Sequence, residues 1–182
     1  MSTVVRLGHI ALSFHQASAA VVAELLRNAG HNVQLRAAPH VEMFERFGRG
    51  DVDMLVSAWL PTSHGEYLAT FVHDTIQLGT LYEPYCIWGV PEYVPEEEVA
   101  SVDDLKRTEV STRMSKLIQG IQPGAGISRL SRAMITAYGL DQYGYHFENG
   151  TEEDCFGRFE EAVAREEWIV IPLCQPQYLH YR

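Results

Sequence analysis

Two short segments of the sequence carry groups that could hold a small charged molecule. Trp59 ends a predicted parallel strand, at the edge where open α/β sheets bind ligands. An indole face attracts a cation by about 0.5 to 2 kcal/mol. Gly124, Ala125 and Gly126 form a turn before a predicted helix, where backbone N–H groups can bind a carboxylate. The alternatives are core packing for Trp59 and a plain strand-to-helix turn for the glycine pair.

Strands and helices that would position Trp59 alternate along the first part of the chain. Their apolar spacing and turn residues predict strands at 4–10, 33–37 and 54–59, helices at 14–29, 40–47 and 61–71, and an extended segment at 75–81. Strands that alternate with helices imply a parallel sheet. We therefore predict an α/β fold.

The second part repeats this alternation after a change of composition near Glu83 and Pro84, where we place a boundary between two lobes. Ser101 and Asp104 have the spacing of a helix-capping pair. The predicted elements are strands at 85–90, 116–121, 145–148 and 168–173, with helices at 127–138 and 152–165. Residues from 174 onward have no clear partner element.

The composition is that of an acidic protein with a core of its own. The chain has 182 residues, of which 46% are hydrophobic, and a net charge of −10. Because Lys and Arg are not clustered, we expect no nucleic-acid partner. No apolar run reaches the roughly 18 residues of a membrane span, and the N-terminus lacks the features of a signal peptide.

Common catalytic motifs are missing from the sequence. It contains no GxSxG, GxGxxG, GxxxxGK[ST] or HExxH pattern. The three cysteines, Cys86, Cys155 and Cys174, include no CxxC pair and indicate neither a zinc site nor a disulfide framework. Cys174 as a nucleophile would need a His or acidic partner that no motif supplies. We therefore predict a protein that is not an enzyme and needs no metal or cofactor.

Three segments, with a continuation of the third, resemble the substrate-binding proteins of ABC importers for glycine betaine, proline betaine and choline. They are residues 50–67 (GDVDMLVSAWLPTSHGEY), 90–105 (VPEYVPEEEVASVDDL), 118–147 (IQGIQPGAGISRLSRAMITAYGLDQYGYHF) and 167–176 (EWIVIPLCQP). The resemblance implies the two-lobed type 2 periplasmic-binding-protein fold with mainly parallel sheets. It implies a first lobe at 1–83, a second at 84–173 and a return segment toward the first lobe at 174–182. We expect the C-terminal elements that close the first lobe in the family to be missing here.

The resemblance also implies a set of ligand-binding residues. Trp59 matches the first tryptophan of the family's aromatic cage, and the turn at 124–126 matches a ligand-binding turn in which Ala125 stands where a bulky aromatic can sit. Cys174 stands where a third cage aromatic is expected, so the three-tryptophan cage is incomplete. The remaining candidates are His64, Ser13, Phe14, Tyr85 and Tyr178. For His64 the alternative is a solvated surface histidine, and for Phe14 it is core packing.

By this resemblance the chain is the solute-binding component of an ABC importer, which holds a quaternary-ammonium or zwitterionic solute between its lobes and delivers it to the membrane subunit. Its place would be periplasmic or extracytoplasmic, and a second copy of the chain could complete the first lobe. The alternative is a cytosolic ligand-sensing or interaction module that keeps the fold with an altered cleft, which Ala125 and Cys174 favour.

Overall fold

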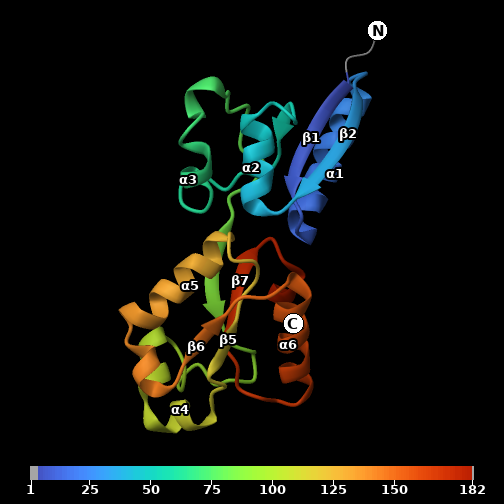
Figure 1. Cartoon of the computed structure of the whole chain (residues 1–182). Helices are drawn as coiled ribbons and strands as arrows, with labels where there is room; N and C mark the ends of the chain where they lie inside the picture. Colours follow the sequence, from blue (N-terminus) through green and yellow to red (C-terminus); the bar gives the residue numbers. More distant parts are fainter. Residues whose placement is uncertain (1–3, 182) are drawn as a thin grey trace. The chain divides into compact units, whose positions relative to one another are not determined.

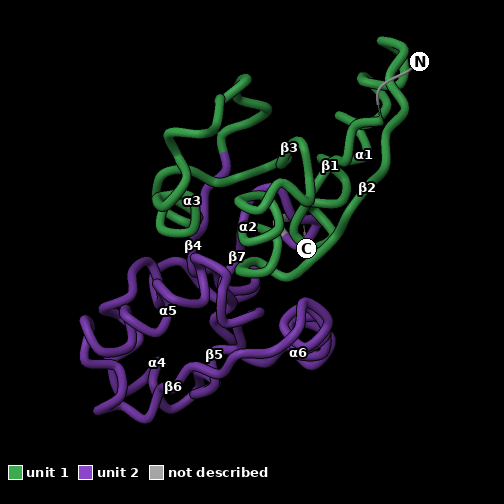
Figure 2. The backbone as a smooth tube through the Cα atoms, turned by 45° about the horizontal axis from the view of Figure 1, so that its top comes forward, with its two compact units in different colours: residues 1–83 green, residues 84–182 purple. Residues whose placement is uncertain are grey.

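The computed structural model describes residues 4–181, and the chain divides into two compact units, residues 1–83 and 84–182 (Figures 1 and 2). No helix within the described residues is long and apolar enough to cross a membrane.

Unit 1, residues 1–83, is built on a parallel sheet of three strands in the order β2-β1-β3 (Figure 1). Its elements are β1 (Val4–Ile10), α1 (Ser13–Asn28), β2 (Asn32–Ala38), α2 (His40–Gly48), β3 (Met54–Leu55), α3 (Gly65–Leu68) and a 3₁₀ turn at Val72–Asp74. Gly30 has the left-handed φ of +90° that ends α1, as the sequence predicted. The expected alternation of strands and helices is confirmed here.

The core of unit 1 lies where the helices cover the sheet. Apolar side chains of β1 and α1 meet in a buried cluster that includes Leu7, Ala19 and Ala23. Helix α2 approaches β1 closely at Gly8, where an added methyl group would lie 2.7 Å from the Met43 sulfur. A glycine at this point lets α2 pack directly on the sheet.

Two expectations for unit 1, a strand and a helix, were wrong in their bounds. The strand predicted at 54–59 ends at Leu55, because Ser57 has a left-handed φ of +64° that extended strands do not tolerate. Trp59 therefore lies in the segment after the strand and not at its end. The helix predicted at 61–71 is reduced to α3 and a 3₁₀ turn, and residues 75–81 belong to no sheet.

Unit 2, residues 84–182, contains two small sheets. Strand β4 (Tyr85–Gly89) pairs antiparallel with β7 (Ile171–Gln175), and β5 (Leu117–Gln119) pairs parallel with β6 (His146–Glu148). The helices are α4 (Thr108–Arg113), α5 (Gly126–Ala137) and α6 (Glu152–Ala164), and 3₁₀ turns lie at Val102–Lys106, Leu140–Tyr143 and Tyr178–Tyr181. The sheets of the described chain are thus mainly parallel, as expected, with β4 and β7 as the exception.

The last predicted strand lies later in the sequence than expected. The prediction placed it at 168–173, whereas β7 extends to Gln175 and sets Cys174 opposite Cys86. Residues 174 and 175 therefore have a partner element, β4.

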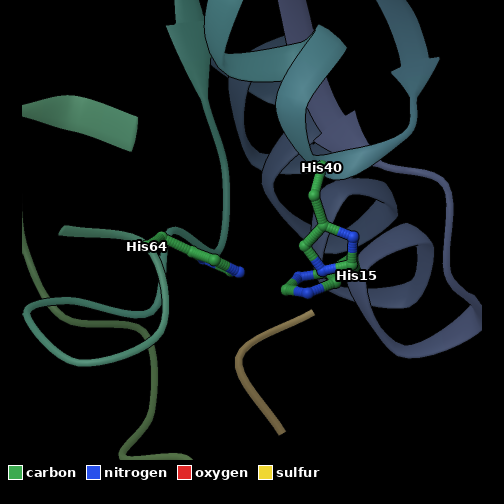
Figure 3. Close-up of side chains that lie close together, drawn as sticks. All are labelled: His15, His40 and His64. Atoms are coloured by element: carbon green, nitrogen blue, oxygen red, sulfur yellow. The ribbon is translucent and has the colours of Figure 1, made fainter. Parts of the chain in front are cut away.

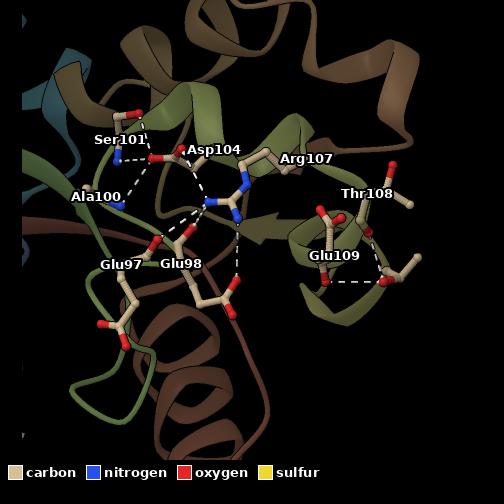
Figure 4. A network of polar contacts seen from close by, with 9 residues as sticks. Glu97, Glu98, Ala100, Ser101, Asp104, Arg107, Thr108 and Glu109 are labelled. Atoms are coloured by element: carbon tan, nitrogen blue, oxygen red, sulfur yellow. Dashed lines mark hydrogen bonds and ion pairs between the residues drawn. The ribbon is translucent and has the colours of Figure 1, made fainter.

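Polar contacts organise the acidic loop before α4 (Figure 4). The predicted capping pair is confirmed: the Asp104 carboxylate accepts hydrogen bonds from the Ser101 backbone and hydroxyl at 2.8 Å each. The Arg107 guanidinium donates to the backbone oxygen of Glu98 at 3.3 Å. Glu96 and Glu97 are exposed and Glu98 is partly exposed, so these glutamates do not form a buried acid/base pair.

Candidate ligand-binding site

Both nitrogen atoms of Trp59 are held by hydrogen bonds inside unit 1. Its backbone N–H donates to His64 Nδ1 at 2.8 Å. Its indole Nε1–H donates to Tyr82 Oη at 2.9 Å and to Ser57 Oγ at 3.1 Å. The Ser57 hydroxyl also bonds to Tyr82 Oη and to His15 Nδ1. A serine, a tyrosine and two histidines thus fix the position of one tryptophan.

The indole ring also packs against other rings. The Phe14 ring is stacked on it with centroids 5.4 Å apart and planes 26° apart, and the His64 ring lies 6.2 Å away at 27°. Only 9% of Trp59 is exposed. These contacts hold the indole in one orientation.

Phe14 and Ser13, both from the start of α1, differ in their surroundings. Phe14 is buried against Trp59, so its ring takes part in the aromatic cluster of the candidate site. Ser13 is exposed. The ligand contacts predicted for the two residues stay predictions.

Three buried histidines lie close together in unit 1 (Figure 3), and two of them, His15 and His64, pack their rings against Trp59. His15 comes from the first turn of α1, His40 from the first residue of α2, and His64 from the residue before α3. One ring nitrogen from each lies within 4.8 Å of the others. Burial, followed by the nearby rings of His64 and His40, lowers the pKa of His15 to about 2. His15 is therefore neutral at physiological pH.

Three histidines in such a group could ligate a metal ion, but the hydrogen bond from the Trp59 backbone to His64 argues against it. His64 Nδ1 accepts the Trp59 backbone N–H, so in the neutral ring the proton is on Nε2. An imidazole ligates a metal only through a nitrogen that carries no proton. In Figure 3 the far end of the His64 ring points toward His15 and His40. The geometry therefore fits a hydrogen-bonded cluster that supports Trp59 better than a metal centre.

Sequence reasoning found Trp59 and His64 but missed four residues that hold them: His15, His40, Ser57 and Tyr82. The available signal was the distribution of histidines, since six of the eight occur in the first 83 residues. His64 itself is 1% exposed, so the alternative of a solvated surface histidine was wrong.

In unit 2 the candidate turn leads directly into α5. Ala125 is the N-cap and is 3% exposed, and Gly126 is the first helical residue. Alanine offers no side-chain oxygen to cap the helix, and the first N–H groups of an α-helix have no intrahelical acceptor. The Arg129 guanidinium donates to the backbone oxygen of Gly124 at 2.8 Å and steadies the turn. The start of α5 is thus a rigid set of backbone donors.

The other candidates of unit 2 lie on or beside the pair of strands β4 and β7. Cys174 is 1% exposed, and its backbone N–H donates to Gln177 Oε1 at 3.1 Å. Tyr85, at the start of β4, is half exposed. Tyr178 donates from its hydroxyl to Glu160 at 3.0 Å and lies edge-on to Phe156, so it packs on α6. Trp88, a further aromatic of β4, donates to Ser131 at 2.8 Å and packs against the core of unit 2.

Comparison with known proteins identifies the family. The model of the OpuAC family, described as the substrate-binding domain of ABC-type glycine betaine transport systems, matches residues 3–181. The chain belongs to this family. Family membership confirms the resemblance read from the sequence, and the family's own description is that of a substrate-binding domain.

Solved structures of ABC-transporter binding proteins share the fold. The glycine betaine/L-proline-binding protein ProX of Borrelia burgdorferi has 25% identity and a TM-score of 0.85 over 99% of this chain and 66% of its own. Lactococcal OpuAC with glycine betaine has 23% identity and a TM-score of 0.84, over 99% of this chain and 68% of its own. A choline-binding protein in complex with choline has 18% identity and a TM-score of 0.77, over 98% and 62%. The chain thus spans about two thirds of the length of these structures, and the predicted type 2 periplasmic-binding-protein fold is confirmed.

Within this OpuAC-family chain, the predicted site residues divide between the two units. Unit 1 brings Trp59, His64 and Phe14 into direct contact. In unit 2, Tyr85 and Cys174 share one pair of strands, and the turn at 124–126 begins a helix that contacts β7. A shallow depression of about 290 Å³ between α2 and residues 67–71 includes none of the candidates.

Proposed function

We propose that the chain binds a small quaternary-ammonium or zwitterionic solute, such as glycine betaine or choline, as the solute-binding component of an ABC importer. The observation that carries the proposal is Trp59, which the contacts of unit 1 hold in a fixed position. A quaternary ammonium has no N–H to donate, so an aromatic face is the group best suited to hold it.

The opposite end of a zwitterion would bind at the start of α5. The N–H groups that follow Ala125 form a donor set for a carboxylate, and the positive end of the helix dipole favours an anion there. In this proposal the two units close on the ligand, and the closed form delivers it to the membrane subunit from an extracytoplasmic position. A choline-type solute, which has a hydroxyl in place of the carboxylate, would use these donors less.

The affinity should be lower than that of a complete aromatic cage. Two positions where the resemblance places aromatic rings hold Ala125 and Cys174, both buried. The loss of two cation–π contacts would cost roughly 1 to 4 kcal/mol, about a fivefold to thousandfold loss in affinity. The same two residues favour the second candidate function, a ligand-sensing module whose cleft accepts a different solute.

Isothermal titration calorimetry with glycine betaine, choline and proline betaine tests the proposal. We expect binding by the wild-type chain and a loss of at least about tenfold in affinity for Trp59→Ala, because the cation loses its ring. Trp168→Phe is the matched control, since Trp168 lies in the core of unit 2 under Arg113. Circular dichroism and thermal melts establish that each variant folds.

Two results would contradict the proposal. A folded wild-type chain that binds none of the three solutes would favour the ligand-sensing module. Equal loss of affinity in the Trp59 and Trp168 variants would show that general destabilisation, and not a ring contact, sets the affinity.

A further inference from the structure

Two cysteines far apart in the sequence face each other across β4 and β7. Cys86 and Cys174 are direct partners in the antiparallel register, and their sulfur atoms lie 2.7 Å apart. We propose that Cys86 and Cys174 form a cross-strand disulfide when a disulfide-bearing oxidant is present. This inference does not depend on which solute the chain binds.

The hydrogen-bond pattern of the two strands places this pair at a site that suits a disulfide. In an antiparallel pair, directly opposed residues either exchange both backbone hydrogen bonds or exchange none. The Cys174 N–H donates to Gln177 Oε1 and not to Cys86, so this is a pair of the second kind. The register of the two strands agrees with this assignment. Two residues beyond Cys86 along β4, Trp88 lies opposite Pro172, and a proline has no N–H with which to exchange a hydrogen bond.

The geometry that follows from this pattern matches a disulfide. Directly opposed residues that exchange no hydrogen bonds have Cα atoms about 4.5 Å apart, within the range of about 4.4 to 6.8 Å found in disulfides. The side chains of opposed residues also emerge on the same face of a sheet. Bond formation therefore needs a small movement of two side chains and no shift of the strands.

The two thiols differ in a way that assigns the order of reaction. The contact between the two thiols lowers the pKa of Cys86, whereas the pKa of Cys174 is raised by the same contact and by burial. Cys86 is partly exposed and Cys174 is buried. Cys86 is therefore the thiolate that meets the oxidant first.

The reaction balances as two thiol–disulfide exchanges. The Cys86 thiolate attacks one sulfur of the oxidant, such as oxidised glutathione, and forms a mixed disulfide while one glutathione thiolate leaves. Cys174 then gives its proton to solvent and attacks the Cys86 sulfur, and the second glutathione leaves. The two cysteines lose two electrons and two protons, and one glutathione disulfide becomes two thiols.

The third cysteine provides an internal control. Cys155 is 1% exposed in α6, and its thiol donates to the backbone oxygen of Gln119 at 3.3 Å. Burial raises the pKa of Cys155 to about 12, so its thiolate is scarce at neutral pH. It should stay reduced under conditions that oxidise the other two.

The test treats the full chain with excess oxidised glutathione, blocks free thiols under denaturing conditions and maps the peptides by mass spectrometry. We expect one blocked cysteine, Cys155, and one peptide pair that links Cys86 to Cys174 and is lighter by two hydrogen atoms. Cys174→Ser should keep a stable glutathione adduct on Cys86, whereas Cys86→Ser should not acquire one on Cys174. Cys155→Ser should oxidise like the wild type.

Each contrary result would overturn part of this inference. Three blocked cysteines in the folded wild type, or a link to Cys155, would overturn the proposed pair. A glutathione adduct on Cys174 in the Cys86→Ser variant would overturn the order of attack.

A thermal melt gives a second readout, which does not depend on the mapping of peptides. The bond would close a loop between residues 88 positions apart, which should raise Tm by at least about 5 °C over the reduced chain. The Cys86→Ser/Cys174→Ser double variant should melt at one temperature with and without the oxidant. An equal Tm for the oxidant-treated and the reduced wild type would contradict the proposed bond.

Discussion

The two units present their candidate ligand-binding groups by different means. In unit 1 a tryptophan is held by hydrogen bonds and ring contacts from Phe14, Ser57, His64 and Tyr82. In unit 2 the candidate donors are backbone N–H groups at the start of α5, fixed by the helix itself. Single substitutions of side chains should therefore damage the first group strongly and the second only where they remove a backbone N–H.

The largest effect is expected for His64→Ala. The substitution removes the acceptor of the Trp59 N–H and leaves a cavity at a side chain that is 1% exposed. We expect the free energy of unfolding to fall by about 2 to 4 kcal/mol, measured by urea denaturation.

The matched control for this variant is His146→Ala. His146 belongs to β6 and its side chain is 54% exposed, so its loss should cost less than about 0.5 kcal/mol. Equal losses in the two variants would contradict the view that buried side chains hold Trp59 in place.

The second prediction concerns the fall in folding stability at acidic pH. The pKa of His15 is lowered to about 2 in the folded chain, so protons bind the unfolded chain more readily between pH 6.5 and about 2. Stability is fully present above pH 6.5 and falls as the pH drops through that window. From pH 7 to pH 5 one such histidine should cost about 2 kcal/mol. The Asp53 carboxyl, whose pKa is lowered to about 2 by hydrogen bonds from Arg6, loses its own contribution only below pH 3.8.

Tryptophan fluorescence can follow this loss of stability at acidic pH in unit 1 alone. Trp59 is the one tryptophan of unit 1, so urea denaturation of the Trp88→Phe/Trp168→Phe variant reports on that unit. Adding His15→Gln to this background removes the titrating ring and should flatten the difference between pH 7 and pH 5. An unchanged difference would assign the acid sensitivity to other groups.

The smallest effect is expected for Gly126→Pro. Proline is tolerated as the first residue of a helix, and Ala125 before it has the extended φ of −69° and ψ of 135° that proline requires. The change deletes one N–H from the proposed carboxylate site. We expect glycine betaine to bind about five to ten times more weakly, which corresponds to about 1 to 1.4 kcal/mol, and choline to bind within twofold of wild type.

Gly126→Ala keeps the N–H and is the control for the added bulk. Calorimetry with glycine betaine and choline on both variants separates the effect of the lost N–H from the effect of the added bulk. A loss for choline as large as that for glycine betaine would indicate a distorted helix and not a missing anion contact.

Local sequence patterns predicted much of the fold. Apolar spacing and Gly30 gave α1 nearly its observed bounds, and the capping pair at Ser101 and Asp104 was found from spacing alone. The pattern failed at Ser57, because a left-handed serine is not visible in a run of apolar residues that reads as one strand. It also missed α4, which is six residues long and begins beside the 3₁₀ turn at 102–106.

In the candidate site, only a residue in a recognisable sequence context could be predicted. Trp59 stood in such a context, and the structure supplies the contacts that fix it. His15 and Tyr82 reach Trp59 only through the folded chain, since His15 meets Ser57 across 42 positions of sequence. Cys86 and Cys174 are 88 positions apart, and no spacing rule could pair them.

The 88 positions between Cys86 and Cys174 also determine when β4 and β7 can pair during synthesis of the chain. Strand β1 can pair with β2 once 28 more residues exist, since Val4 lies opposite Asn32. Strand β4 must wait through 88 positions for β7. At about 5 to 20 residues per second, β4 therefore stays without its partner for roughly 4 to 18 s. Unit 1 can fold during most of that interval. In the nascent chain, the edge of β4 that will bind β7 is meanwhile unpaired and can pair with strands of other chains.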